Sequence, residues 1–164
     1  NGSFTHIVSE LLKKAEGIEI THVPYKGGSD AARSVIAGET QMLFDAPLTA
    51  INNARGGKVK LLAIAGPARI AAIENVPTMA ETGLKGFDIP GLEQMLGPPG
   101  MPKELVAKVN ALLMQAVKSP DIAKVYRESG FIFLATNAEE HARIMRENYN
   151  RWGEVIRRTG IRLD

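Results

Sequence analysis

The sequence predicts an α/β protein with a mainly parallel sheet. β-branched segments alternate with amphipathic helical segments, and only a few residues connect them, as in α/β layers. Residues 59–65 (VKLLAIA) are apolar with little polar alternation, which is typical of a strand buried on both faces. The length of 164 residues fits one domain or about one and a half. The composition, 45% hydrophobic and 23% charged, is enough for a sizeable core.

The first half of the chain predicts alternating helices and strands. Ser3 is a good helix N-cap, and Gly17, Gly38 and Gly56-Gly57 are stop signals for three helices. The predicted elements are a helix between Ser3 and Gly17, a strand at 18–25, a helix at 30–37, a strand at 40–44, a helix at 47–55 and a strand at 59–65.

The second half predicts three helices and one short strand after a strong break at Gly97 to Pro102. We expect a domain boundary between Phe87 and Pro102. The predicted elements are a short helix at 79–82, an extended segment at 87–96, a helix at 103–118 that buries Leu105 and Leu112, a helix from Ser119-Pro120 to Gly130, a strand at 131–135 and a helix from Asn137 to Thr159. Three apolar stripes and one strand cannot close a sheet, so this part should complete a domain begun elsewhere.

Composition excludes several classes of protein. The net charge of +2 without clustered basic residues argues against a nucleic-acid partner, and scarce aromatic residues argue against a base-stacking surface. The absence of cysteine excludes disulfides and thiolate metal sites, but it fits both a cytoplasm and a periplasm. The longest apolar runs fall far short of the roughly 20 residues that span a bilayer.

No catalytic motif is present, so we predict no catalytic residue, no cofactor and no metal site. P-loop, dinucleotide-binding, nucleophile-elbow and zinc-protease patterns are missing. His6, His22 and His141 lie far apart in different predicted elements, which is typical of surface or capping histidines. Residue 1 is Asn, and a helix cap follows almost at once. We interpret this start as a cut inside a longer protein, the alternative being a mature end left by processing.

Two helix starts indicate an anion-binding site. One helix begins at Ser3 with Thr5 in its first turn, and another begins at Gly27-Gly28 after Lys26. Helix starts offer unpaired N–H groups and partial positive charge to a carboxylate or phosphate. Asp45, at the end of the 40–44 strand, could accept a hydrogen bond from a ligand amine or hydroxyl. The alternative is that these are ordinary connections and a turn-forming Asp.

These motifs resemble the Bug solute receptors of the tripartite tricarboxylate transporters. The likeness covers nearly the whole chain, and the order of its VPYKGG and VPT-x-x-E-x-G motifs is specific. The matching segments are THVPYKGG at 21–28, MLFD at 42–45, GKVKLLAIA at 57–65 with Arg69, VPTMAETG at 76–83 and GPPGMP at 97–102.

The resemblance implies a two-lobed, Venus-flytrap fold of the type II periplasmic binding proteins, with one complete lobe and the returning part of the other. Residues 1–88 would form lobe two, and 89–164 the hinge strand and the end of lobe one. A small carboxylate would bind between the lobes, and permease subunits in the membrane would be the partners of a periplasmic receptor that is not an enzyme. The implied ligand-binding residues are Ser3, Thr5, Tyr25, Lys26, Gly27, Gly28 and Asp45.

Two departures from the family pattern leave the ligand class open. Leu92-Glu93-Gln94 stands where many relatives carry an aromatic residue, and Ser29-Asp30 stands where relatives often have a small residue and Pro. Two other functions stay as alternatives: an effector-sensing domain of a transcription regulator and a small α/β hydrolase. The apolar helix faces between Lys103 and Thr159 also predict a dimer of this chain.

Overall fold

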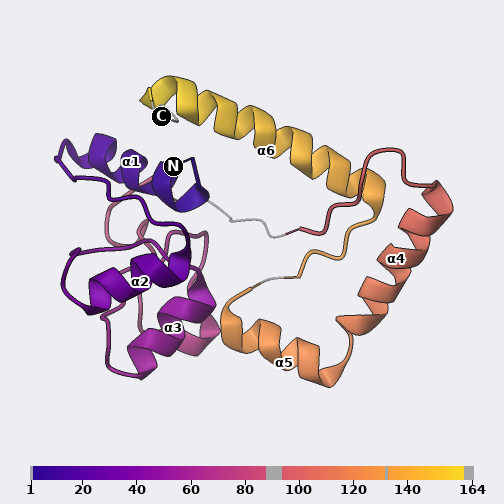
Figure 1. Cartoon of the computed structure of the whole chain (residues 1–164), viewed down its shortest axis with the longest axis horizontal. Helices are drawn as coiled ribbons and strands as arrows, with labels where there is room; N and C mark the ends of the chain where they lie inside the picture. Colours follow the sequence, from indigo (N-terminus) through magenta and orange to yellow (C-terminus); the bar gives the residue numbers. More distant parts are fainter. Residues whose placement is uncertain (1, 88–93, 132, 161–164) are drawn as a thin grey trace.

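The computed structural model describes residues 2–87, 94–131 and 133–160, and the six α-helices in them lie close to the predicted positions (Figure 1). None of these described helices is both long and apolar enough to cross a membrane. A 3-10 helix was not predicted, and residues 79–82 form a turn instead of the predicted short helix. The helices are α1 (Phe4–Glu16), α2 (Gly28–Ile36), α3 (Pro47–Arg55), η1 (Ala71–Ile73), α4 (Lys103–Ala116), α5 (Pro120–Ser129) and α6 (Ala138–Thr159).

The predicted capping residues are confirmed at three helix starts. The side chains of Ser3, Ser119 and Asn137 accept hydrogen bonds from backbone N–H groups three residues later, at 3.3, 3.4 and 2.9 Å. Gly17 and Gly130 end α1 and α5 in the left-handed conformation, with φ of 63° and 75°. Local capping chemistry therefore accounts for these helix boundaries.

The prediction of hydrogen-bonded strands is wrong for the described residues. Segments 18–25, 40–44, 59–65 and the described part of 131–135 form no ladder, and the only bridge among described residues pairs Ile64 with Thr78 in parallel. Ile64 donates to the Pro77 carbonyl and accepts from the Met79 N–H, both at 2.9 Å. Composition predicts where a chain is extended, but a strand also needs a neighbour to share its hydrogen bonds.

Only part of the predicted boundary region, between Phe87 and Pro102, lies within the described residues. Most of the predicted extended segment at 87–96, including Leu92 and Glu93, lies outside the described residues. Figure 1 shows the two sides of this region: α1, α2 and α3 gather in one body, and α4, α5 and α6 form an arch that extends to one side of it. The arch returns to the body at two places, where α5 contacts η1 and α3, and where α6 contacts α1.

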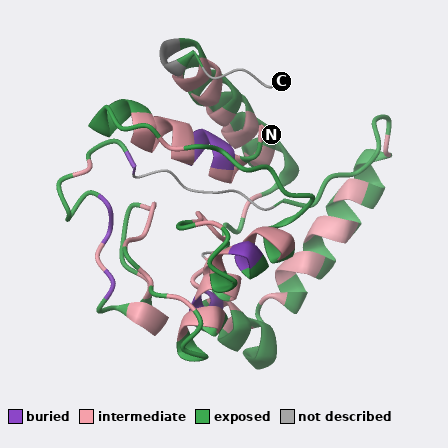
Figure 2. Cartoon of the chain, turned by 60° about the vertical axis from the view of Figure 1, so that its left-hand side comes forward, coloured by how far each residue is buried: buried purple, intermediate pink, exposed green. Residues whose placement is uncertain are grey.

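The main core lies between α1, the 79–87 segment and α6. Val8 is fully buried, and it packs with Met79 and Phe87, which are 4% and 2% exposed. Trp152 of α6 packs against the same cluster, and its ring meets the ring of Phe4 edge-on at 5.7 Å. Buried residues are concentrated in this region and in the body around α2 and α3 (Figure 2). The core thus joins the beginning of the chain to its last helix.

A second contact joins the arch to the body at Gly130. Its backbone is left-handed, and a Cβ atom there would lie 2.8 Å from two side-chain atoms of Ile70, next to η1. The neighbouring Ser129 is 1% exposed. Glycine is needed here for two reasons, because both the backbone conformation and the close approach of Ile70 exclude a side chain.

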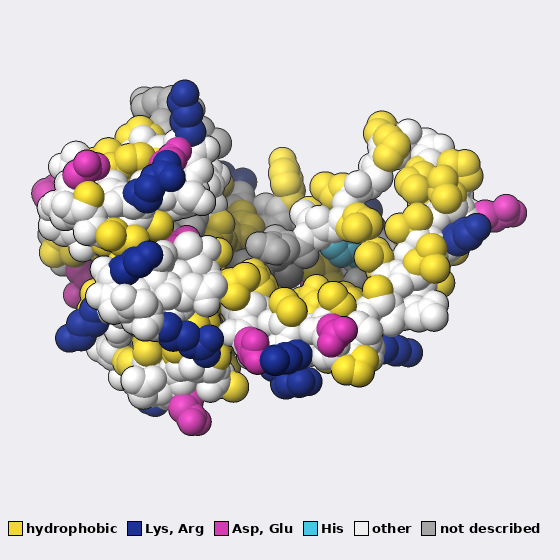
Figure 3. Space-filling model, turned by 60° about the horizontal axis from the view of Figure 1, so that its bottom comes forward, with side chains coloured by type: hydrophobic (Ala, Val, Ile, Leu, Met, Phe, Trp, Pro, Cys, Tyr) yellow, Lys and Arg dark blue, Asp and Glu magenta, His cyan; other side chains and the backbone are white. Residues whose placement is uncertain are grey.

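Much of the arch is uncovered. The prediction that α4 buries Leu105 and Leu112 is wrong, since these side chains are 45% and 57% exposed and no residue of α4 is buried. Apolar side chains line the hollow between arch and body in Figure 3. The accessible surface is 11602 Å², whereas a compact monomer of 17.7 kDa would expose about 7,900 Å². The excess reflects an open arrangement, in which large apolar side chains of α4 and α5 stay exposed although α5 and α6 also contact the body.

The VPTMAETG segment forms a hydrogen-bonded turn held by Arg69. Glu81 accepts the Thr78 N–H at 2.7 Å, and the Thr78 hydroxyl accepts the Glu81 N–H at 3.2 Å, which is the reciprocal pattern of a capping box. Arg69 Nε donates to both carboxylate oxygens at 3.0 and 2.9 Å, and its Nη1 donates to the Glu74 carbonyl. These bonds lower the pKa of Glu81 to about 2, the bond from Arg69 contributing most.

Replacing Gly130 should destabilise the fold more than replacing an unobstructed left-handed glycine. We expect Gly130→Ala to lower the free energy of unfolding by about 2–4 kcal/mol, because a clash adds to the backbone cost. Gly17→Ala is the matched control: its φ is 63° and no atom lies within 4 Å of the added Cβ, so it should lose only about 1–2 kcal/mol. Urea unfolding of both variants measures the difference, and equal losses would contradict the close contact.

Glu81→Gln should lower the melting temperature by a few degrees at neutral pH, and Glu74→Gln should not, because only the Glu81 carboxylate accepts from Arg69. The pKa of Glu81 is lowered, so its carboxylate contributes its full stabilisation of the fold above the ordinary pKa of 4.5. This stabilisation is lost as pH falls towards about 2. Thermal melts across this range should show the wild type and Glu81→Gln converging in acid. A difference that stays constant down to pH 2 would rule out the carboxylate as its source.

Candidate functional site

The first of the two predicted helix starts is that of α1, and Ser3 and Thr5 there are called the first rim. Ser3 adopts the extended N-cap conformation, and its Oγ lies 3.0 Å from the Thr5 hydroxyl oxygen. The same Ser3 Oγ accepts the His6 N–H, so Ser3 uses one of its lone pairs to cap the helix. Ser3 is exposed and Thr5 half-buried. The structure therefore brings these two predicted residues together as a pair of hydroxyl groups at a helix N-terminus.

The second predicted helix start is that of α2, and Gly27 and Gly28 there are called the second rim. Gly27 is the N-cap, with extended backbone that any residue could adopt and no side chain to cap the first turn. A Cβ atom on Gly27 would meet no atom within 4 Å. Tyr25 and Lys26 precede it with exposed side chains. Neither the conformation nor the packing requires glycine at this position, so its main effect is to leave the first amides of α2 open.

Asp45 lies beside the second rim. Its Oδ1 is 3.7 Å from the position that a Cβ on Gly28 would occupy, and it accepts the Ala46 N–H at 2.8 Å. The side chain is half-buried. Burial raises the pKa of Asp45 above its usual value, and the bond from Ala46 opposes this rise. The structure thus places the Asp45 carboxylate, which accepts a hydrogen bond from the Ala46 N–H, next to the open amides of α2.

The prediction that the histidines stand apart is wrong for His6 and His22. Their rings stack, with centroids 4.1 Å apart and planes 25° from parallel. His6 lies in the first turn of α1, and His22 lies in the segment that leads to Tyr25 and Gly27. Sequence reasoning missed this pair because the two residues belong to different elements, and no spacing rule brings those elements together.

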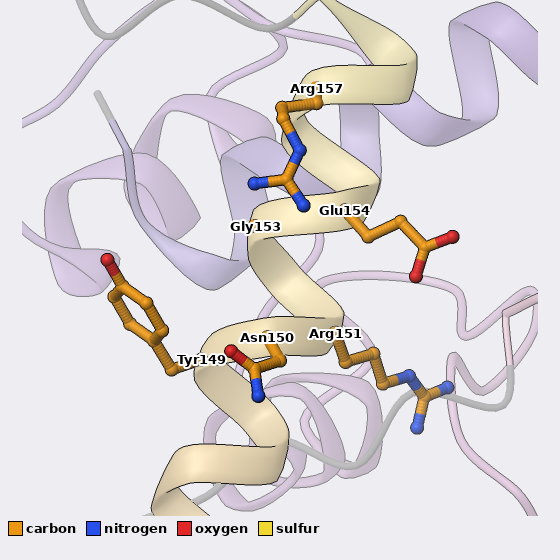
Figure 4. Close-up of a pocket in the computed structure, with 6 residues that line it drawn as sticks. All are labelled: Tyr149, Asn150, Arg151, Gly153, Glu154 and Arg157. Atoms are coloured by element: carbon orange, nitrogen blue, oxygen red, sulfur yellow. The ribbon is translucent and has the colours of Figure 1, made fainter.

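The described structure also contains a shallow depression that lies apart from both rims. Tyr149, Asn150, Arg151, Gly153, Glu154 and Arg157 line it, and Figure 4 shows that all of them come from α6. The side chains of one helix enclose this space without help from another element, and none of the predicted site residues contributes to it. We therefore assign it no role in binding. No group of three or more metal-ligating side chains occurs among the described residues.

Comparison with known proteins gives a consistent result. A sequence model of the tripartite tricarboxylate transporter family receptors matches residues 1–161. The periplasmic binding protein BugD is 25% identical, with a TM-score of 0.91 over 98% of this chain and 54% of its own. The adipate complex of R. palustris Rpa4515 is 28% identical, with a TM-score of 0.92 over the same shares.

The malate complex of MatC from Rhodopseudomonas palustris is also 28% identical, with a TM-score of 0.79 over 94% of this chain and 54% of its own. These likenesses show the fold class that the sequence predicted, although the strands are not paired in the described residues. The chain spans about half the length of the first curated relatives that it matches.

Proposed function

Because this chain belongs to the tripartite tricarboxylate transporter family of receptors, we propose that it supplies one side of the ligand cleft of a periplasmic receptor for a small carboxylate. The observation that supports this most is the start of α2, where the uncapped Gly27 leaves amides open beside Asp45. Helix N-termini bind carboxylates through such amides and the helix dipole. No step of this function needs covalent chemistry.

Each predicted residue has a role in this proposal. The amides at Gly27 and Gly28 would hold one ligand carboxylate, and Lys26 would add positive charge. Ser3 and Thr5 would donate hydroxyl hydrogen bonds from the first rim, and Tyr25 would border the ligand. Asp45 would accept from a ligand hydroxyl or amine. Two related receptors have been solved with adipate and with malate, and malate carries the hydroxyl that adipate lacks.

The proposed division places lobe two at residues 1–88, and the hinge strand and returning part of lobe one at 89–164. The body formed by α1, α2 and α3 fits the first unit, and the arch fits the second. In this arrangement closure of the two lobes buries the carboxylate against the helix starts, and the closed receptor delivers it to permease subunits in the membrane. The half of the cleft that this chain does not supply would contribute the rest of the affinity.

The test of this function is titration of the protein with malate, adipate and other small carboxylates. We expect weak, saturable binding, seen as NMR shifts of the Gly27, Gly28 and Ala46 amides, because one side of the cleft suffices for contact but not for enclosure. If no member of the panel shifts these amides at millimolar concentration, the receptor function is wrong.

Asp45→Asn should affect the binding of malate more than the binding of adipate. We expect it to weaken malate binding by roughly fivefold relative to adipate, because a neutral amide is a poorer acceptor for the malate hydroxyl. Asp121→Asn, at an exposed position in the first turn of α5, is the control and should change neither affinity. An unchanged malate-to-adipate ratio in Asp45→Asn would remove Asp45 from the ligand contacts.

The uncovered arch also leads us to expect self-association of this chain. The exposed apolar side chains of α4 and α5 include Leu105, Leu112, Ile122 and Val125. Burying them against a second copy recovers roughly 25 cal/mol per Å² of apolar surface. Sedimentation velocity should show a dimer that grows with concentration, and Leu112→Lys should shift the equilibrium towards monomer. A strictly monomeric protein at high concentration would contradict this expectation.

A further inference from the structure

The first turn of α1 is joined to the segment before α2 by the stacked rings of His6 and His22. His6 is 9% exposed, and its Nδ1 accepts the Gly2 N–H at 3.1 Å. Its backbone N–H donates to Ser3 Oγ, which in turn lies 3.0 Å from the Thr5 hydroxyl. His6 therefore contacts the capping residue of the first rim and, through its ring, the segment that carries the second rim.

Protonation of His22 opposes this arrangement. The hydrogen bond from Gly2 to His6 Nδ1 holds the His6 ring in the first turn of α1, with its face against His22. A proton on His22 would add a charge 4.1 Å from the His6 ring, at the positive end of the α1 dipole. Uptake of a proton by His22 therefore opposes the stack.

The surrounding charges mostly act in the same direction. Burial lowers the pKa of His22 most, followed by its electrostatic interaction with His6, and Lys13 adds a smaller effect. Glu10 opposes them, and its carboxylate lies 4.0 Å from His6 Nε2. Lys13 Nζ is only 3.0 Å from the same Glu10 oxygen, and this positive charge weakens the effect of Glu10 on the pKa of His22.

We propose that His6 and His22 form a positioning clamp that sets the Ser3–Thr5 rim against the segment leading to Gly27, and that protonation opens it. The clamp itself is a property of the fold, and its effect on ligand binding rests on the proposed function. The pKa of His22 is lowered in the folded chain. The clamp therefore contributes its full stabilisation above the ordinary histidine pKa of 6.5, and this stabilisation is lost as pH falls below that value. A receptor with this clamp holds its ligand less well in mild acid.

An NMR titration from about pH 8 to about pH 5 tests the clamp without any ligand. The amides of Ser3, Thr5 and His6 should shift together with the His22 imidazole signal. His22→Phe keeps a flat ring for stacking but cannot take up a proton, so the three amides should lose most of this shift. His141→Gln, which changes a histidine on α6, is the matched control and should titrate like the wild type. Equal amide shifts in His22→Phe and wild type would overturn the proposal.

A malate titration at two pH values tests the effect on binding. Wild-type affinity should fall by roughly threefold or more between about pH 7.5 and about pH 5.5, and His22→Phe should lose less in the same buffers, which also corrects for protonation of malate. Equal losses in the two proteins would overturn the coupling to ligand. If malate binds to neither protein, the proposed function fails for this ligand, and the ligand-free amide shifts still decide whether the clamp exists.

Discussion

Burial of Val8 against Met79 and Phe87 is the contact on which the arrangement of the candidate site depends. It fixes α1 on the 79–87 segment, and Trp152 extends the same cluster to α6 through Phe4. The first turn of α1 carries both Phe4 and Thr5, so the packing that anchors this turn also orients the hydroxyl pair. A polar rim is held in place here by the apolar side of its own helix.

The start of α2 is positioned differently from the start of α1. No side chain caps its first turn, and Asp45 approaches it from the segment just before α3 instead. A carboxylate near a helix N-terminus is favourable because of the helix dipole, but burial of Asp45 makes its charged form costly. The two effects leave a site that accepts a hydrogen bond and still offers open amides. That combination suits a ligand with both an acid group and a donor.

Sequence reasoning succeeded where a few neighbouring residues decide the structure. Ser3, Ser119 and Asn137 predicted three helix starts, because a cap acts on amides only three residues away. It failed where the partner is distant in the chain. The segment 59–65 has strand composition, yet only Ile64 finds a backbone partner among the described residues, and nothing in the spacing of His6 and His22 predicts their stack.

The failed prediction for α4 separates the formation of a helix from its burial. Leu105 and Leu112 lie on the stripe that predicted this helix, and both are exposed, so α4 forms with little of the packing that stabilises most helices in proteins. Its residues KELVAKVNALLMQA are rich in strong helix formers, which explains why the helix is nevertheless formed. An amphipathic pattern thus predicts that one face of the helix packs against another part of a protein. It does not predict that this partner is close in sequence. The apolar hollow under the arch is the region where this predicted packing is incomplete among the described residues.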